Sequence, residues 1–396
     1  MNTLLLALSP DGPPDDADLL HKTFVDPLGQ ARFLCDRYLD TYLAEGGSKL
    51  KLITGRKGCG KSHFIRYLAS QARNRGYMAQ VVSAQEMPLF SFDQIYRQIM
   101  KGVNTGTLIR HYTGALLSRL GYAYDRHDVA FLEWAVSHGR EGSVVRREIK
   151  DRLAEDLFGD LDMDRSLATA ILLLASDDLG VHSLGAEVRS TLDRWLKGDY
   201  VPARERNTIG IRKAIDRYSA RLVFRSLLHF LPKANVKGVL LAIDDVHQVT
   251  EKHPEHGAKY TRTKRDEFYE SLRQVVDEVD SVRGFFLILS GRREIVEDQS
   301  RGIRSYEALW MRLQNEVRSE KFNRFADLID LDHAWQQSGR ACLAQIASNV
   351  LDLVGAPPPL RGEILDELGG IDPAGSVSPV RMTMSMVLDK TRRQQP

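Results

Sequence analysis

Five short apolar segments recur along the chain, each bounded by polar or turn-forming residues. They are KLKLITG, YMAQVVSA, VKGVLLAIDD, GFFLILSG and FADLIDLD, at residues 49–55, 77–84, 236–245, 284–291 and 325–332. Each is apolar almost throughout rather than alternating, which is typical of strands buried on both faces of a parallel sheet. Helical patterns such as SHFIRYLASQARNRG and RDEFYESLRQVVDEVD lie between them. This alternation predicts an α/β core of three layers around a parallel sheet.

Two longer helical regions interrupt and extend this core. Residues 100–232 carry several amphipathic stretches and no convincing strand, which predicts a large helical insertion between the second and third strands. After the fifth strand, three helical patterns in residues 336–396 predict a C-terminal helical lid. Residues 1–20 include a Pro-, Asp- and Gly-rich stretch that predicts a mobile leader. The predicted core therefore spans residues 21–335.

Composition narrows the class of protein without deciding it. The 396 residues are 43% hydrophobic and 27% charged, with a net charge of +2, which is ordinary for a globular protein. Because opposite charges are interspersed, any DNA-binding surface has to be a local patch. The three cysteines form no CxxC pair, which fits a reducing cytosol. The apolar run Leu4–Leu8 is too short for a signal peptide or a membrane span, so we expect a cytoplasmic protein with no membrane contact.

The first strand runs into a basic, glycine-rich loop that matches the pattern G-x-x-x-x-G-K-[ST] completely. Its residues are Gly55, Arg56, Lys57, Gly58, Cys59, Gly60, Lys61 and Ser62. Such a loop, between a strand and a helix, lets backbone N–H groups and the helix dipole converge on phosphate oxygens. We predict that Lys61 reaches the β- and γ-phosphates of ATP and that Ser62 ligates Mg²⁺. His63 completes the predicted nucleotide-binding set; the alternative is a Gly-rich turn that matches by chance.

The third strand ends in a pair of acidic residues. Asp244 is the predicted Mg²⁺ ligand of a Walker B strand, and Asp245 occupies the position of a water-activating carboxylate. The alternative is that both aspartates only cap the following helix. Asp245 is one methylene shorter than the glutamate usually found there, so hydrolysis is expected to be slow or conditional, and nucleotide binding is the safer prediction.

Polar residues elsewhere suggest sensor and lid functions. Ser290 and Arg292 follow the fourth strand, beside the Walker B strand, where side chains can contact the γ-phosphate or its water. A polar strand end with a solvated turn is the alternative. Arg381 lies in the first turns of the last predicted helix, where a cation is unfavourable unless an anion compensates it. A nucleotide phosphate and a surface salt bridge explain it equally well.

A basic stripe is predicted along one helix that leads into the third strand. Lys213, Arg217, Arg221 and Arg225 recur every four residues and could meet DNA phosphates or a neighbouring subunit's nucleotide. A solvated helix face is the commoner explanation of such spacing. Within the phosphate loop, Cys59 is either a small filler or a thiol whose pKa Lys61 and the helix dipole lower.

With these motifs the chain resembles the AAA-type P-loop ATPases of the BrxC/BrxD group, from bacterial BREX phage-defence systems. The resemblance covers most of the chain beyond about residue 20. It is carried by GKSHFIRYLASQARNRGYMAQVVSAQEMPLFSFDQIYRQIM, RWLKGDYVPARERNTIGIRKAIDRYSARLVFRSLLHFL and SPVRMTMSMVLD. It implies an AAA/ASCE-type P-loop NTPase that self-assembles and works with DNA and other defence proteins. Two departures are Asp245, where a glutamate is expected, and FVDPLGQARFL, which lacks the arginine typical of the adenosine-side box.

Two functions follow from these expectations. The first is an oligomeric ATPase that binds and hydrolyses ATP with Mg²⁺ and acts on, or loads partners onto, DNA in phage defence. The second is a nucleotide-gated switch or scaffold with little turnover that recruits protein partners, because DDVH and LSGR are also similar to STAND signalling ATPases.

Overall fold

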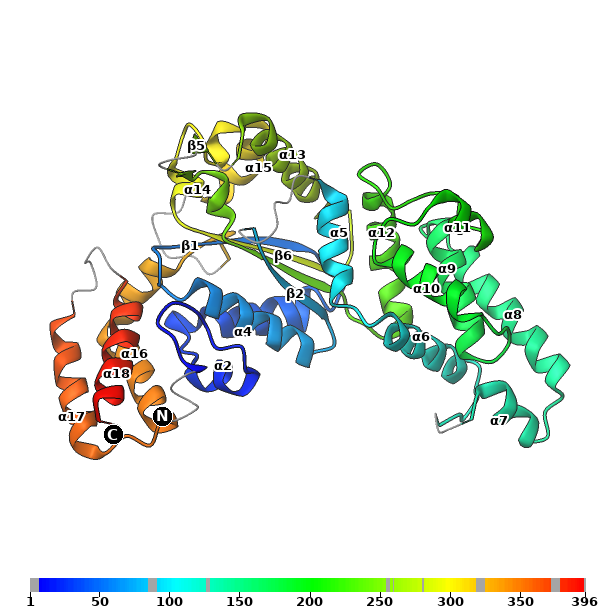
Figure 1. The fold of residues 1–396 in the computed structure, drawn as a ribbon, viewed down its shortest axis with the longest axis horizontal. Helices are drawn as coiled ribbons and strands as arrows, with labels where there is room; N and C mark the ends of the chain where they lie inside the picture. The colour runs from blue at the N-terminus through cyan, green and yellow to red at the C-terminus, as the bar shows by residue number, and fades with distance from the viewer. Residues whose placement is uncertain are drawn as a thin grey trace.

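A five-stranded parallel sheet forms the centre of the molecule (Figure 1). The computed structural model describes residues 7–84, 91–125, 129–253, 257–258, 260–279, 281–317, 325–371 and 378–394. The strands are β1 (Lys49–Thr54), β2 (Met78–Ser83), β3 (Val239–Asp244), β6 (Phe285–Gly291) and β7 (Leu328–Asp330). They lie in the order β2-β3-β6-β1-β7, and all their pairings are parallel. The five predicted strands are confirmed, and their carboxyl ends meet at one edge of the sheet.

Helix α4 (Lys61–Asn74) covers one face of the sheet. Its buried side chains share one hydrophobic core with alternate residues of the strands, such as Ile53, Ala242 and Ile288. The N-terminal elements join the same core. They are α2 (Ala17–Thr23), η1 (Pro27–Gly29), α3 (Gln30–Leu34) and the π-helical η2 (Cys35–Tyr42).

Helices α13 (Arg262–Val279) and α15 (Glu307–Val317) cover the opposite face. Phe268 and Leu272 of α13 belong to the second hydrophobic core, together with the alternate strand residues Leu241 and Leu287. Helices on both faces make the predicted three-layer α/β arrangement. The short elements near this layer are η4 (Val246–Val249), β4 (Lys252–His253), β5 (Gly257–Ala258), α14 (Glu294–Glu297) and η5 (Ile303–Ser305).

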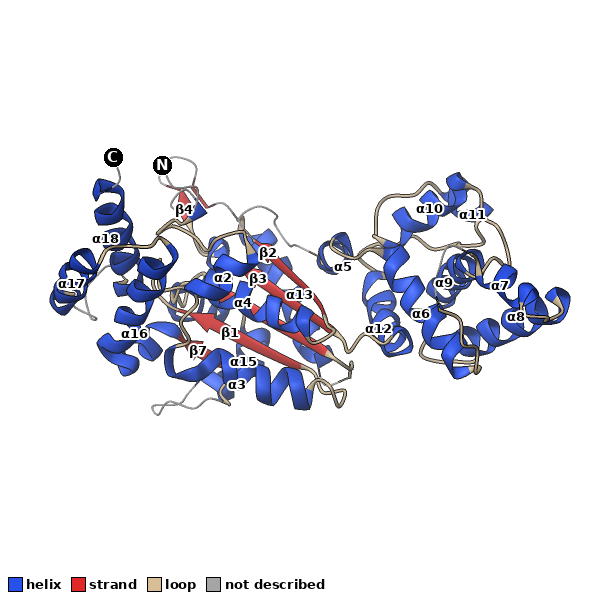
Figure 2. Cartoon of the chain, turned by 90° about the horizontal axis from the view of Figure 1, so that it is seen from below, coloured by secondary structure: helices blue, strands red, loops and turns tan. Residues whose placement is uncertain are grey.

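The described residues between β2 and β3, which include the predicted insertion at residues 100–232, form helices joined by loops and no strand. Most of these helices form a group to one side of the sheet (Figure 2). Phe224 joins this group to the core, because its ring lies 5.6 Å from that of Phe92 and 5.0 Å from that of Phe285. The elements are α5 (Phe92–Lys101), α6 (Thr105–Arg119), α7 (Phe131–Ser137), α8 (Gly142–Phe158), α9 (Arg165–Asp178), α10 (Ala186–Leu196), α11 (Ala203–Thr208), α12 (Ala220–Phe230) and η3 (Leu231–Ala234).

Three C-terminal helices pack on the α4 side of the sheet. They are α16 (Leu331–Leu353), α17 (Pro358–Glu367) and α18 (Pro379–Gln394), with η6 (Leu368–Gly370) after α17. The lid boundary predicted at residue 336 falls inside α16, which begins directly after β7. Gly339 divides this helix at a kink, with φ 66° and ψ −165°.

The N-terminal segment differs from the expected mobile leader. Leu8 is buried in the core that α4 shares with the sheet, and α2 begins within the predicted leader with Asp16 as its N-cap. Asp15 forms an ion pair with Arg66 of α4 at 2.9 Å. This segment is therefore held against α4 and the core by the buried Leu8 and by the exposed Asp15–Arg66 ion pair. Residues 1–6 lie outside the described part of the chain.

None of the described helices is both long and apolar enough to cross a bilayer. The three cysteines carry free thiols, in different surroundings. Cys35 is buried, and its burial raises the pKa of the thiol to about 11 against a partial lowering by Arg75. Cys342, on α16, is half-buried.

Candidate functional site

The predicted phosphate loop connects the carboxyl end of β1 to the first turn of α4. Gly55, Gly58 and Gly60 have positive φ angles of 153°, 79° and 90°. At Gly58 a side chain would also collide with a neighbour, because an added Cβ would lie 2.8 Å from the Cβ of Arg381. The loop therefore combines an unusual backbone with close packing against α18.

Lys61 is buried inside this loop. Its ammonium group donates to the carbonyl oxygens of Gly55 at 3.0 Å and Arg56 at 2.8 Å. Only 8% of the residue is exposed, so the loop encloses a positive charge beside the free N–H groups of a helix N-terminus. This arrangement favours an anion at the mouth of the loop.

Cys59 lies fully buried in the same loop. Burial raises the pKa of its thiol to about 11, and the Lys61 ammonium offsets only part of that effect. The interpretation that Lys61 and the helix dipole lower this pKa is therefore wrong. Cys59 is a small core side chain, as the alternative interpretation proposed.

The acidic pair lies at the same sheet edge as the loop, with only β6 between β3 and β1. Asp244 is 7% exposed, and its Oδ1 accepts the N–H of Asp245 at 2.8 Å. Asp245 has a left-handed backbone, with φ 57°, and its Oδ2 accepts the hydroxyl of Ser83 at 2.9 Å. Asp245 therefore has a fixed position at the end of β3.

The two predicted sensor residues have different surroundings. Ser290 is fully buried in β6 beside Ile53 of β1, and its hydroxyl oxygen has no hydrogen-bond partner among the described residues. Arg292 lies near the surface, and its Nη1 is 3.2 Å from Oε1 of Glu251. Glu251 was not predicted from the sequence, because it lies beyond the acidic pair that ends β3 and belongs to no recognised motif.

A cavity of about 500 Å³ joins most of these residues. Asp245, Arg292 and Glu251 line it from the sheet edge, and Arg381 lines it from α18. Gly55, Arg56, Asp244 and Ser290 lie outside the lining set, at the base of the loop or within the sheet. The loop residues that line the cavity are Lys57, Gly58, Cys59, Gly60, Lys61, Ser62 and His63.

Part of the cavity lining is apolar. Phe24 stacks on Tyr67 of α4, with 3.8 Å between ring centroids and 9° between planes. His63 is fixed beside them, with Nε2 2.9 Å from the carbonyl oxygen of Leu20, and burial lowers its pKa. The apolar lining residues are Phe24, Val25, Pro27, Leu331, Trp335, Ile346, Val380 and Met384. A lining that combines a cationic loop with apolar side chains suits a ligand that has both phosphate and ring parts.

The N-terminal segment also lines the cavity, at residues 8–14. The Arg381 guanidinium forms an ion pair with Asp11 of this segment, while its aliphatic part packs on Gly58. Arg381 therefore lies over the phosphate loop and has the salt bridge of the alternative interpretation, while its contact with a nucleotide phosphate stays a prediction. Asp11 was not predicted, because a Pro- and Asp-rich stretch carries no signal of a distant partner.

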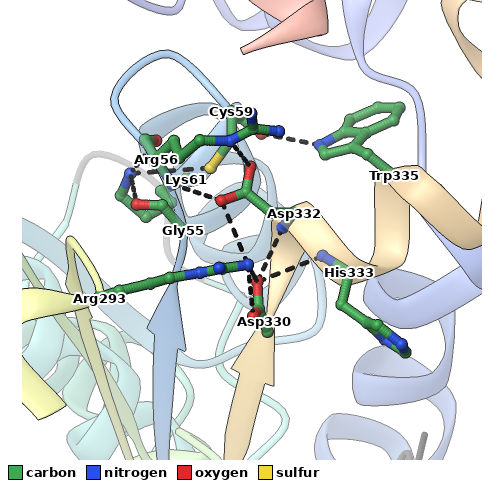
Figure 3. A network of polar contacts seen from close by, with 9 residues as sticks. All are labelled: Gly55, Arg56, Cys59, Lys61, Arg293, Asp330, Asp332, His333 and Trp335. Atoms are coloured by element: carbon green, nitrogen blue, oxygen red, sulfur yellow. Dashed lines mark hydrogen bonds and ion pairs between the residues drawn. The ribbon is translucent and has the colours of Figure 1, made fainter. Parts of the chain in front are cut away.

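A network of buried polar contacts holds the base of the loop (Figure 3). Asp332, in the first turn of α16, accepts the backbone N–H of Arg56 at 2.7 Å. Trp335 of the same helix donates its indole N–H to the carbonyl of Cys59 at 2.8 Å. Neither Asp332 nor Trp335 was predicted from the sequence. The available signal was DLIDLD, whose aspartates follow a strand that ends at the same sheet edge.

Most of the chain, including the elements that build this site, matches a known protein family. A protein-family model described as BREX system ATP-binding protein BrxC/D matches residues 36–352. The chain belongs to this family. No curated protein and no solved structure matches the chain.

The match to the BrxC/D family includes the phosphate loop, the acidic pair, Arg292 and the first turn of α16. The family is one of ATP-binding proteins, which fits a cavity lined by a cationic loop and by apolar side chains. Asp11, Phe24 and Arg381 line the same cavity from outside the matched range. Some of the residues that line the cavity therefore lie inside the range matched by the BrxC/D family model, and others lie outside it.

The basic stripe of this BrxC/D protein is not on one helix, so that prediction is wrong. Helix α12 begins at Ala220, which leaves Lys213 and Arg217 in the preceding loop. Residues 211–216 are not helical, and Asp216 starts a turn directly before α12, because its Oδ1 accepts the N–H groups of Tyr218 at 2.9 Å and Ser219 at 3.1 Å. Arg221 and Arg225 remain on α12, and none of the four lines the cavity.

Proposed function

We propose that this BrxC/D protein is an AAA-type ATPase of the ASCE class that binds and hydrolyses ATP in phage defence. The observation that carries the proposal is the cavity in which Lys61, Asp245 and Arg292 meet at one sheet edge. Strand order supports it as well, because the strands that end in the loop and in the acidic pair flank the strand that ends in Ser290.

The residues of the cavity divide between binding and hydrolysis. Residues Gly55–Ser62 bind the phosphates through backbone N–H groups and Lys61. Ser62 and Asp244 offer the oxygen ligands that Mg²⁺ prefers, and this ion neutralises phosphate charge when bound. Asp245 orients the attacking water, while Ser290 and Arg292 contact the γ-phosphate. The hydroxyl of Ser290, which has no hydrogen-bond partner in the described part of the chain, supports this role, because a buried polar group without a partner is costly unless a ligand completes it.

Nucleotide binding is tested with Lys61→Ala. We expect this variant to lose ATP binding by calorimetry while its circular dichroism stays native, since the hydrogen bonds that the structure describes for the ammonium group are to its own loop. Lys57→Ala, which replaces an exposed lysine of the same loop, is the matched control and should retain binding more strongly. Retained micromolar binding by Lys61→Ala contradicts the assignment of the phosphate loop.

Hydrolysis is tested with Asp245→Asn, by steady-state phosphate release with and without duplex DNA. Asparagine tolerates a left-handed backbone and keeps an acceptor for Ser83, so the fold should survive. Loss of a group that activates water lowers turnover by about 100-fold or more. An unchanged rate means that Asp245 does not orient the water.

A nucleotide-gated switch with little turnover is the second candidate function. The contact between Asp245 and Ser83 favours it, because this hydrogen bond occupies one carboxylate oxygen and holds a short side chain against β2. In this case wild-type turnover stays close to that of Asp245→Asn, with or without DNA. Ser83→Ala frees the carboxylate, and a rise in turnover would show that the hydrogen bond restrains hydrolysis.

We further propose a homo-oligomer in the cytoplasm that contacts DNA and other defence proteins. Lys213 and Arg217 are exposed in the loop before α12, beside the exposed ring of Tyr218. Lys213→Glu/Arg217→Glu should weaken DNA binding and reduce the slope of log K against log salt by about 0.9 for each DNA phosphate that the variant no longer neutralises. Arg146→Glu/Arg147→Glu on α8 is the control with the same charge change. Mass photometry with and without ATP and DNA measures the assembly, and equal DNA binding by both variants removes this surface from the proposal.

A further inference from the structure

The first turn of α16 contacts the phosphate loop at two points (Figure 3). Asp332 accepts the Arg56 backbone N–H through Oδ2 at 2.7 Å and the Arg56 Nε–H through Oδ1 at 3.1 Å. Trp335, three residues later on the same helix face, donates to the Cys59 carbonyl at 2.8 Å. One helical turn therefore fixes a donor at the start of the loop and an acceptor near its end.

Asp332 is held from the other side by the tail of β6. Its side chain is 1% exposed, and Nη2 of Arg293 lies 3.5 Å from its Oδ2. The same nitrogen is 2.8 Å from Asp330, which caps α16 by accepting the N–H groups of Asp332 and His333. A buried carboxylate is stable only with such positive partners and donors. Asp332 is therefore fixed before any ligand arrives.

We propose that Asp332 is a positioning residue, which keeps the phosphate loop in the shape that binds phosphate without contacting the nucleotide. The inference rests on the proposed function, because it assigns a role toward the same ligand. It follows from the hydrogen bond to Arg56. Without an acceptor for the Arg56 N–H the backbone of the loop is less ordered, and ordering it when the nucleotide binds costs part of the binding free energy. The residue lies outside the cavity lining, so its effect passes through the backbone of the loop.

Calorimetry with ADP on the full-length chain tests the proposal. Asp332→Asn retains one acceptor oxygen but loses the charge that attracts Arg56 and Arg293, and we expect ADP affinity to fall by about 10-fold or more. Asp330→Asn is the matched control, because it makes the same charge change and also contacts Arg293 but does not contact the loop. Its ADP affinity should stay within about threefold of the wild type, although the cap of α16 weakens.

Two further measurements separate positioning from a general loss of structure. Adenosine has no phosphate, so its weak binding, followed by saturation-transfer NMR, should be equal in Asp332→Asn and the wild type. Trp335 provides a spectroscopic signature, since ADP should change tryptophan emission in the wild type and much less in Trp335→Phe. Adenosine binding that falls together with ADP binding would show a damaged cavity and overturn the positioning role.

The outcomes distinguish this inference from the proposed function. Wild-type ADP affinity in Asp332→Asn, with binding abolished in Lys61→Ala, overturns the role of Asp332 alone. Absence of ADP and ATP binding in the unaltered protein overturns both. Weaker ADP binding in Asp332→Asn, with adenosine binding and the Asp330→Asn control unchanged, supports the inference.

Discussion

Replacing Gly58 with alanine is expected to separate α18 from the phosphate loop. The new Cβ would lie 2.8 Å from Cβ and 2.9 Å from Cδ of Arg381, whereas carbon atoms normally approach to about 3.5–4.0 Å. Because the Cβ of Arg381 is attached to the backbone of α18, the helix itself has to move. Overpacking of this kind costs about 1–3 kcal/mol. The left-handed backbone, with φ 79°, adds about 1–2 kcal/mol for a residue other than glycine.

Gly60→Ala is the matched control for this substitution. Gly60 has φ 90°, but no atom lies within 4 Å of the position of its added Cβ. Its cost should therefore be limited to the backbone term of about 1–2 kcal/mol. The difference between the two variants measures the steric contact with Arg381.

Hydrogen exchange of the α18 amides, without nucleotide, is the direct assay. A steric cost of about 1–3 kcal/mol lowers the free energy of local opening and speeds exchange in α18 by about 5–150-fold. Gly60→Ala should leave that exchange unchanged. Adding Arg381→Ala to Gly58→Ala should slow exchange only partly, because it removes Cγ and Cδ but leaves the Cβ contact. Equal exchange in both glycine variants would refute the tight contact between α18 and the loop.

Three other predictions concern the same region. Gly339→Ala should lower stability by about 1–3 kcal/mol in chemical denaturation, because its φ and ψ are almost restricted to glycine; Gly362→Ala, inside α17 with open space around it, should be neutral or stabilising. Burial lowers the pKa of His63, so the unfolded chain takes up a proton first as pH falls below about 6.5 and the melting temperature should decline there. His63→Gln should flatten this decline between pH 7.5 and 5.5, and an unchanged profile contradicts it. Asp11→Asn should strengthen ATP binding by up to about fivefold, since the exposed ion pair that competes for Arg381 contributes at most about 1 kcal/mol; weaker binding in calorimetry would oppose this reasoning.

Local patterns predicted the sheet and the loop well. The five strands are continuous apolar segments between turn residues, and a strand buried on both faces produces that pattern regardless of its partners. The meeting of the loop and Asp245 followed from a general property of parallel sheets, whose carboxyl ends share one edge. The glycine-rich loop between β1 and α4 was equally accessible, because the spacing of its glycines and lysine is local.

Long-range contacts and competing side-chain hydrogen bonds account for what the sequence did not reveal. The basic stripe was placed on one helix because its spacing is helical, but the residues before Asp216 are not helical, and Asp216 and Ser219 form a turn from which α12 begins. Asp332 and Arg56 are distant in the chain, so neither residue signals the other. Leu8 was assigned to a mobile leader because short apolar segments beside Pro and Asp do not reveal whether a core receives them.

The unequal burial of the three thiols has a practical consequence. Cys35 and Cys59 are buried, and burial raises the pKa of each thiol to about 11, so both are almost entirely protonated at neutral pH. Maleimides react with the thiolate form, so these two cysteines should react slowly. Cys342 is the accessible thiol, and it lies on α16 beyond the kink at Gly339. A fluorescent dye added to the unaltered protein will therefore attach at this helix, where single-molecule measurements can follow how α16 moves as nucleotide is supplied.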